Sequence, residues 1–164
     1  MEGEAVRGRV EALWTKRAHR GPMDQHSEAT FVAGKGIEGS VGWSRTRQVT
    51  IISLEAWRAM NKDLGAVVDP VARRANVMVS GVDLAMSRGK VLRLGDVRIQ
   101  LLGETRPCER MEEAHDGMRA AMDGDWRGGA FGQVLNGGVV SVGDAVQWEA
   151  VVAAGEQSAA QIPR

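Results

Sequence analysis

The sequence is poor in cysteine and in aromatic residues other than tryptophan. Its 164 residues include one cysteine, two phenylalanines and no tyrosine. A single cysteine excludes a disulfide within the chain. The first residues, Met1-Glu2-Gly3-Glu4, lack the apolar run of a secretory signal. Together these features predict a protein that works in the reducing cytoplasm.

An excess of charge is also missing. Lys+Arg and Asp+Glu balance at 21 residues each. The balance gives no global attraction to nucleic acids or anionic membranes. No stretch approaches the roughly 20 apolar residues of a transmembrane helix. We therefore expect neither a nucleic acid nor a membrane as a partner.

Several catalytic signatures are absent. His19, His26 and His115 lie far from any cluster of cysteines or carboxylates with ligand spacing, so we expect no zinc site. There is no Gly-x-Ser-x-Gly motif of a serine hydrolase. The glycine-rich segments match neither a Walker loop nor a dinucleotide fingerprint. The single cysteine remains the most informative candidate for chemistry.

Glycine, in contrast, is abundant: the chain has 21 glycines and only 4 prolines. Many tight turns between short alternating segments predict a mainly β fold with short helices, in a barrel or a compact sandwich. The length favours a single domain, which we place at residues 1–152. The small, polar residues 153–164 are expected to form a flexible tail.

Hydrophobic periodicity places the elements along the chain. The clearest helix spans residues 54–64, with Ser53 as its N-cap and Gly65 at its end. A second helix is expected over 108–122, weakened by Gly117. Gly95-Asp96 and Gly143-Asp144 are each predicted to turn a β-hairpin. Strands are predicted at residues 6–14, 48–52, 76–80, 91–94, 97–102, 132–135, 139–142 and 146–152.

Cys108 stands at the predicted start of the second helix. Pro107 suits a first turn, and Arg106 and Arg110 flank the thiol. Unpaired backbone N–H groups and the two arginines favour a thiolate, the form that attacks electrophiles or binds soft metals. The alternative is a buried cysteine that serves as a small, unreactive apolar residue.

Basic residues close to glycines form a second pattern. Lys35 lies within the segment 34–39, Arg73 and Arg74 precede Asn76, and Arg127 precedes Gly128-Gly129. Glycine allows backbone N–H groups to approach an anion, and arginine offers a planar set of donors that fits phosphate. The alternative is that these segments are ordinary solvated loops.

Taken in order, several short motifs resemble the MOSC domain, the C-terminal domain of molybdenum cofactor sulfurases. The resemblance covers about residues 30 to 150. Ser40 departs from it, since the family often has aspartate there. The matching segments are 36–39, 47–53, 73–77, 94–97, Pro107-Cys108, 127–129, Gly138 and 143–146.

The resemblance implies a closed β-barrel in which Cys108 ligates molybdenum held by a molybdopterin cofactor. Family members similar to the mitochondrial amidoxime-reducing component reduce hydroxylamines, amidoximes and N-hydroxylated bases. This implies a small N-hydroxylated substrate and a separate electron-donor protein. The expected cofactor-binding residues are Lys35, Arg73, Arg74, Asn76, Arg127 and Gly129.

Two alternatives stay open within the same resemblance. In the sulfurase branch Cys108 would carry sulfur as a persulfide, and a cysteine desulfurase would be the partner. A thiolate serves both roles, so the sequence does not separate them. The third reading is a module that binds the molybdenum cofactor without catalysis.

Overall fold

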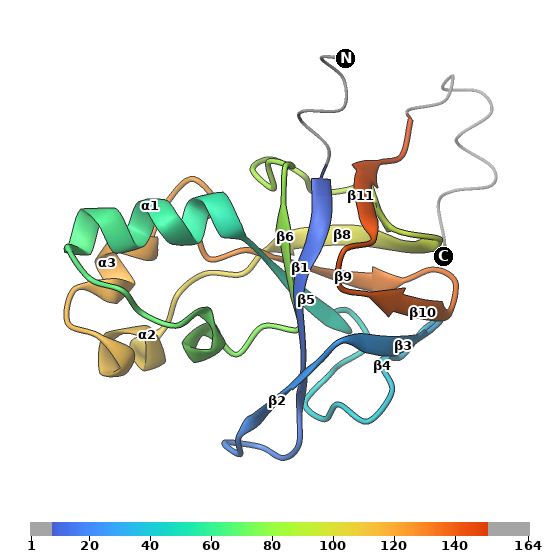
Figure 1. Cartoon of the computed structure of the whole chain (residues 1–164), viewed down its shortest axis with the longest axis horizontal. Helices are drawn as coiled ribbons and strands as arrows, with labels where there is room; N and C mark the ends of the chain where they lie inside the picture. The colour runs from blue at the N-terminus through green and yellow to red at the C-terminus, as the bar shows by residue number, and fades with distance from the viewer. Residues whose placement is uncertain (1–7, 151–164) are drawn as a thin grey trace.

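Seven strands close into a barrel in the computed structural model, which describes residues 8–150 (Figure 1). Their order around the barrel is β11-β7-β8-β9-β5-β6-β1, and β11 pairs with β1 to close it. Only β5 and β6 run parallel among these neighbours. The strands are β1 (Gly8–Lys16), β5 (Val49–Ser53), β6 (Val77–Ser80), β7 (Val91–Leu94), β8 (Val97–Glu104), β9 (Ala130–Val134) and β11 (Ala145–Trp148).

Apolar side chains fill the barrel because inward and outward residues alternate along its strands. In β8, Val97, Ile99 and Leu101 are buried, whereas the residues between them are partly exposed. The interior cluster also includes Val10 and Leu13 of β1. The closed β-barrel that the sequence predicts is thus confirmed.

Four further strands lie outside the barrel ring. β2 (Met23–His26) pairs with the end of β1 and forms a projecting hairpin. β10 (Gly138–Ser141), β3 (Glu28–Val32) and β4 (Gly36–Ile37) form a separate three-stranded sheet. The sequence analysis did not predict β2, β3 or β4.

The helices gather on one side of the barrel (Figure 1). They are α1 (Leu54–Leu64) and the short 3₁₀ helix η1 (Pro70–Arg73) between β5 and β6, and α2 (Glu109–Ala114) and α3 (Met118–Met122) between β8 and β9. Trp57 and Met60 of α1 pack with Met111, Met118 and Met122 in a second apolar cluster. No helix among residues 8–150 is long and apolar enough to cross a membrane.

The helix over 54–64 is confirmed, with Ser53 Oγ accepting a hydrogen bond from Ala56 N and Gly65 in the left-handed conformation. The continuous helix over 108–122 is wrong. Gly117 has φ of 84° and divides it into α2 and α3. This backbone angle is open to glycine and interrupts a right-handed helix.

The two Gly-Asp turns also differ. Gly95-Asp96 joins β7 and β8 as a hairpin, with Leu94 paired to Val97. Gly143-Asp144 makes no hairpin, because β10 pairs with β3 and β11 pairs with β7 and β1. The chain instead leaves the small sheet for the barrel at that turn. The predicted tail at 153–164, and the outer ends of the strands predicted at 6–14 and 146–152, lie outside the described residues.

Candidate active site: a basic cavity beside Cys108

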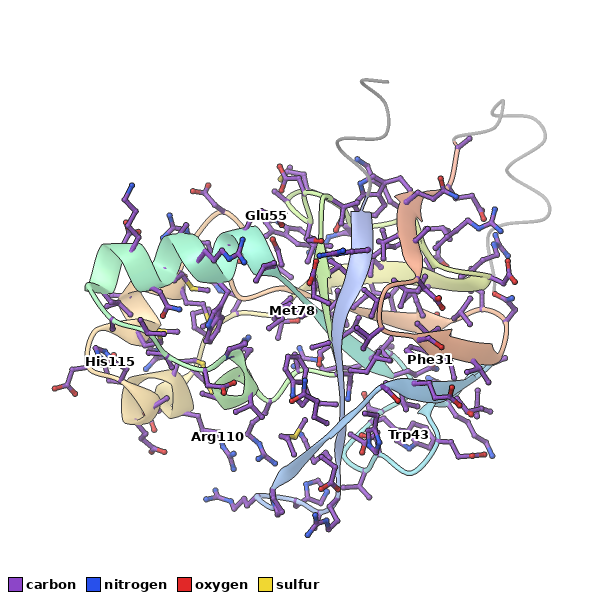
Figure 2. All side chains as sticks on the ribbon, viewed as in Figure 1. Phe31, Trp43, Glu55, Met78, Arg110 and His115 are labelled. Carbon is purple, nitrogen blue, oxygen red and sulfur yellow. The ribbon has the colours of Figure 1, made fainter. Side chains whose placement is uncertain are left out.

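A cavity of about 390 Å³ is lined by residues of the helical side of the molecule and of the β1–β2 hairpin. Such a volume is within the usual range of roughly 300 to 1,000 Å³ for small-molecule sites. Several separate segments meet there: the end of β1, the β1–β2 turn, the loop between β4 and β5, and the segment that carries Cys108. In Figure 2, Trp43 and Arg110 mark the β4–β5 loop and the α2 side of this region.

The cavity is strongly basic although the whole chain is neutral. None of the described residues that line it is Asp or Glu. No acidic side chain of the lining therefore balances its positive charges, and an anionic ligand would do so. The basic residues of the lining are Lys16, Arg20, Arg47, Arg73, Arg74 and Arg110.

Lys16, Arg74 and Arg110 act on one another electrostatically. Burial lowers the pKa of Lys16, and the charges of Arg74 and Arg110 lower it further. Burial also lowers the pKa of Arg74, again with a contribution from Arg110. Repulsion among neighbouring cations disfavours their charged forms, so bound negative charge would relieve it.

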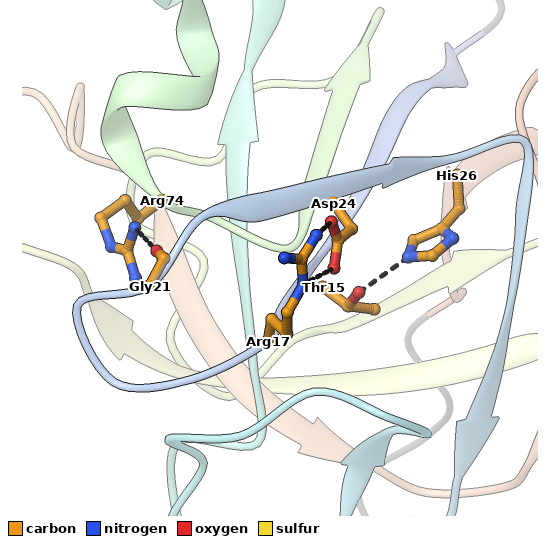
Figure 3. A network of polar contacts seen from close by, with 6 residues as sticks. All are labelled: Thr15, Arg17, Gly21, Asp24, His26 and Arg74. Atoms are coloured by element: carbon orange, nitrogen blue, oxygen red, sulfur yellow. Dashed lines mark hydrogen bonds and ion pairs between the residues drawn. The ribbon is translucent and has the colours of Figure 1, made fainter.

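Arg74 has one terminal nitrogen bound and one free. Its Nη1 donates to the Gly21 carbonyl at 2.5 Å (Figure 3). Its Nη2 is buried and has no hydrogen-bond partner among residues 8–150. A buried donor without a partner is costly, and a ligand oxygen in the cavity would satisfy it.

The β1–β2 hairpin forms one wall of the cavity and is braced by polar contacts (Figure 3). Arg17 donates two hydrogen bonds to Asp24, and Thr15 Oγ1 lies 2.7 Å from His26 Nε2. These contacts pair the two strands on either side of the turn, which carries His19 and Arg20 into the lining.

Cys108 lies at the edge of the cavity with its side chain exposed. It precedes α2 in an extended conformation and makes no side-chain cap hydrogen bond. The expectation that it occupies the first helical turn is therefore wrong by one position, and the expectation of the alternative that it is buried is also wrong. Arg110 lines the cavity, whereas Arg106 faces Asp123 at 3.5 Å.

Arg73 fixes the segment that leads to Cys108. Its Nε donates to the Gly128 carbonyl and its Nη2 to the Thr105 carbonyl, both at 3.0 Å. Burial lowers the pKa of Arg73, and the nearby Cys108 opposes that shift. Arg73 thus connects η1, the Cys108 segment and the chain before β9, and adds positive charge beside the thiol.

Gly128 and Gly129 allow these segments to approach closely. A Cβ on Gly128 would lie 2.1 Å from the Thr105 carbonyl oxygen, and one on Gly129 would lie 2.3 Å from that of Ile51. The Gly129 carbonyl also accepts a hydrogen bond from Thr105 N. Gly128 lines the cavity. Gly129 does not line it, but holds the Cys108 segment through this hydrogen bond.

Asn76 lines the cavity, but its amide is bonded within the barrel. Its Oδ1 accepts from Thr50 N, and its Nδ2 donates to the Trp14 carbonyl. Asn76 therefore joins β1 and β5 at the cavity lining.

Besides Gly129, two more predicted cofactor-binding residues lie outside the cavity lining. Lys35 is exposed in the turn between β3 and β4, and Arg127 pairs with Asp63 at 2.8 Å and donates to the Ala121 carbonyl. Neither lines the cavity. The structure therefore brings Arg73, Arg74 and Asn76 into one cavity lining with Cys108, but not Lys35, Arg127 or Gly129.

Sequence reasoning missed other basic residues of the lining: Lys16, Arg20 and Arg47. They belong to segments that meet only in the folded chain, and none lies in a glycine-rich motif. Arg110 was noted only as a neighbour of Cys108. Ser40, which replaces the usual aspartate, accepts a hydrogen bond from Lys16 N at 3.0 Å and so positions the end of β1.

A comparison with known protein families shows to which family the chain belongs. The family of the MOSC domain matches residues 17–147, which is most of the chain. The chain belongs to the MOSC domain family. No protein of curated function matches it.

Solved structures show the same MOSC fold. YuaD from Bacillus subtilis superposes with a TM-score of 0.71 at 22% identity, covering 85% of this chain and 94% of YuaD. YiiM from Escherichia coli gives a TM-score of 0.67 at 17% identity, covering 89% and 71% of the two chains. YiiM from Geobacillus stearothermophilus gives 0.68 at 14% identity, covering 87% and 75%.

MOSC domains often bind the molybdenum cofactor, and the residues of this cavity fit such a group. The phosphate of a pterin cofactor would meet clustered cations and the unpartnered Nη2 of Arg74. The exposed Cys108 at the edge offers a soft sulfur donor for the metal.

Proposed function

We propose that this MOSC protein binds the molybdenum pterin cofactor in the basic cavity and reduces N–O bonds of small N-hydroxylated compounds. The observation that carries the proposal is a cavity lined by six basic side chains and no described carboxylate, with an exposed thiol at its edge. We place this activity in the cytoplasm, where the single thiol stays reduced.

The chain's own residues have distinct tasks. Lys16, Arg74 and Arg110 bind the cofactor phosphate, and Cys108 is the protein ligand to the metal. Arg73 is a positioning residue, because its hydrogen bonds hold the backbone on either side of the cavity. When bound, the cofactor supplies the two-electron reduction of the N–O bond.

The overall reaction converts R–NH–OH, two electrons and two protons into R–NH₂ and water. The N–O bond breaks, and the oxygen leaves as water. A separate electron-donor protein supplies the electrons in the cell, and reduced viologen replaces it in an assay.

Reduction of an amidoxime or an N-hydroxylated base by reduced viologen tests the proposal. Wild-type protein from a host that makes the cofactor is expected to be active, and apo-protein from a cofactor-deficient host is expected to be inactive. Cys108→Ser should lose most of the activity, because oxygen is a harder donor than sulfur.

Two results would contradict the proposal. One is cofactor-loaded wild-type protein that reduces no N–O substrate. The other is Cys108→Ser with wild-type activity. If the loaded protein is inactive and Cys108 instead accepts sulfane sulfur from a cysteine desulfurase, the sulfur-carrier function replaces this one.

A further inference from the structure

We infer that Trp43 and Arg47 select phosphorylated aromatic substrates, so that N-hydroxylated nucleoside monophosphates are preferred over the corresponding free bases. This inference rests on the proposed function and names its substrate class. Trp43 stacks on the base, and Arg47 binds the phosphate of the same nucleotide.

Trp43 differs from the other four tryptophans, all of which lie within residues 8–150. Trp14 and Trp57 are core residues, and Trp126 and Trp148 pack partly buried against the barrel cluster. Trp43 is 46% exposed and lines the cavity. An aromatic face left uncovered at a cavity edge is suited to stacking on a planar base, a contact worth roughly 1–3 kcal/mol per base.

Arg47 lines the same cavity. It lies over the Phe131 ring at 4.5 Å, which leaves its N–H edges available. None of the ion pairs found among the described residues involves Arg47. A charged donor set that is held in place and unpaired matches the geometry of phosphate.

A compact turn holds the two residues in one unit. Ser44 N donates to the Arg47 carbonyl at 3.0 Å, and Arg47 N donates to Ser44 Oγ at 3.2 Å. The Arg45 carbonyl accepts from Gln48 Nε2 at 2.9 Å, and Val41 N bonds to the Lys16 carbonyl. The loop is therefore anchored on both sides of Trp43 before any ligand binds, which lowers the entropy cost of binding.

Charge in the cavity favours an anionic substrate even after the cofactor binds. The lining provides six basic side chains. The cofactor's phosphate monoester contributes about two negative charges, fewer than the positive charges of these side chains. A positive surplus remains, and Arg20 and Arg47 lie outside the group Lys16, Arg74 and Arg110 that is assigned to the cofactor.

The kinetic test compares one N-hydroxylated purine as free base, nucleoside and 5′-monophosphate on cofactor-loaded protein. The monophosphate is expected to have a kcat/KM about tenfold or more above that of the nucleoside, mainly through KM. Arg47→Ala should remove this preference, whereas Arg45→Ala, an exposed control in the same loop, should retain it. Trp43→Ala should raise KM for all three compounds about tenfold, and Trp43→Phe should restore most of the loss.

A binding measurement makes the inference independent of turnover. Calorimetry on the loaded protein should show AMP binding about tenfold more tightly than adenosine, with the difference lost in Arg47→Ala. Equal affinity for AMP and adenosine, or unchanged binding in both Trp43→Ala and Arg47→Ala, would overturn the inference. If neutral amidoximes are reduced but the monophosphate has no advantage, the inference fails while the proposed function stands. If nothing is reduced yet the binding pattern holds, the proposed function fails and this recognition site stands.

Discussion

Arg73 holds the backbone of the site in place instead of offering its guanidinium to a ligand. The sequence suggested a phosphate ligand, yet the structure gives its guanidinium to the carbonyls of Gly128, Thr105 and Arg106. Those bonds connect segments that are far apart in the chain. Its positive charge also lies near Cys108 while its hydrogen bonds hold the backbone.

Replacing Arg73 is therefore expected to cost both stability and cofactor binding. Arg73→Ala leaves at least two carbonyls without their charged donor and should lower the free energy of unfolding by about 2–3 kcal/mol. Arg106→Ala is the matched control, because the Arg106 side chain is 74% exposed and its pairing with Asp123 is a surface contact. Urea denaturation measures both. Equal stability of the two variants would contradict the positioning role.

Lys16 gives a second prediction for a single residue, based on like-charge repulsion. Its pKa is lowered in the folded protein by burial, Arg74 and Arg110. Unfolded chains then bind more protons than folded ones in the pH window that ends near the ordinary value of 10.5, so stability from this group rises with pH there. Lys16→Gln should abolish that rise.

The same variant should bind inorganic phosphate less well. Wild-type protein is expected to gain thermal stability from phosphate by mass action, and Lys16→Gln should gain less. Lys35→Gln removes an equal charge from an exposed turn outside the cavity and should behave as wild type. If Lys35→Gln reduces the phosphate effect as much as Lys16→Gln, the effect comes from overall charge and the cavity assignment is wrong.

Residues of the site differ in how far sequence could predict them. Cys108 was found because it is unique and lies between arginines in a Pro-Cys motif. Lys16 lies in no motif, and Arg47 begins a segment that carried the family resemblance but gave no sign of a role in the site. The two residues meet only through tertiary contacts. Arg127 matched a glycine-rich motif but forms an ion pair with Asp63, a partner 64 positions away that no local pattern reveals.

Elements with strong local signals were predicted well. Ser53 and Gly65 provide both caps of α1, and the alternation in β8 gives its buried face directly. The short strands β2, β3 and β4 were not predicted: β2 has no buried residue, β3 has one, and β4 has only two residues, so none shows an apolar period. Gly143-Asp144 makes a turn as expected, but the pairing of the strands it joins is decided by the distant β3 and β7.

One prediction concerns the close contact between two elements: the chain just before β9 and the segment that carries Cys108. Gly128→Ala would place a Cβ 2.1 Å from the Thr105 carbonyl oxygen and must displace backbone. We expect a loss of about 2–3 kcal/mol in the free energy of unfolding, together with weaker cofactor retention. Gly124→Ala is the control: its Cβ has nothing within 4 Å, so it adds only the strain of a positive φ, about 1–2 kcal/mol. A harmless Gly128→Ala would show that this contact does not position the Cys108 segment.

At the scale of the whole molecule, a neutral chain concentrates positive charge in one cavity beside a closed barrel. The apolar barrel interior and the separate cluster under the helices form a rigid support, and the connecting segments carry the site. Composition and glycine content predicted a barrel or sandwich, and the resemblance of ordered motifs specified the MOSC barrel. The cavity could not be predicted from composition, because its charge is balanced by acidic residues elsewhere.

The most direct test of the central claim is the molybdenum content of the purified protein. Wild-type chain from a cofactor-competent host is expected to carry molybdenum in near-stoichiometric amount, and protein from a cofactor-deficient host should carry none. In Cys108→Ser the X-ray absorption spectrum of any retained molybdenum should lack one sulfur ligand. Wild-type protein that stays free of molybdenum in the competent host, or a Cys108→Ser spectrum identical to that of wild type, would contradict the account.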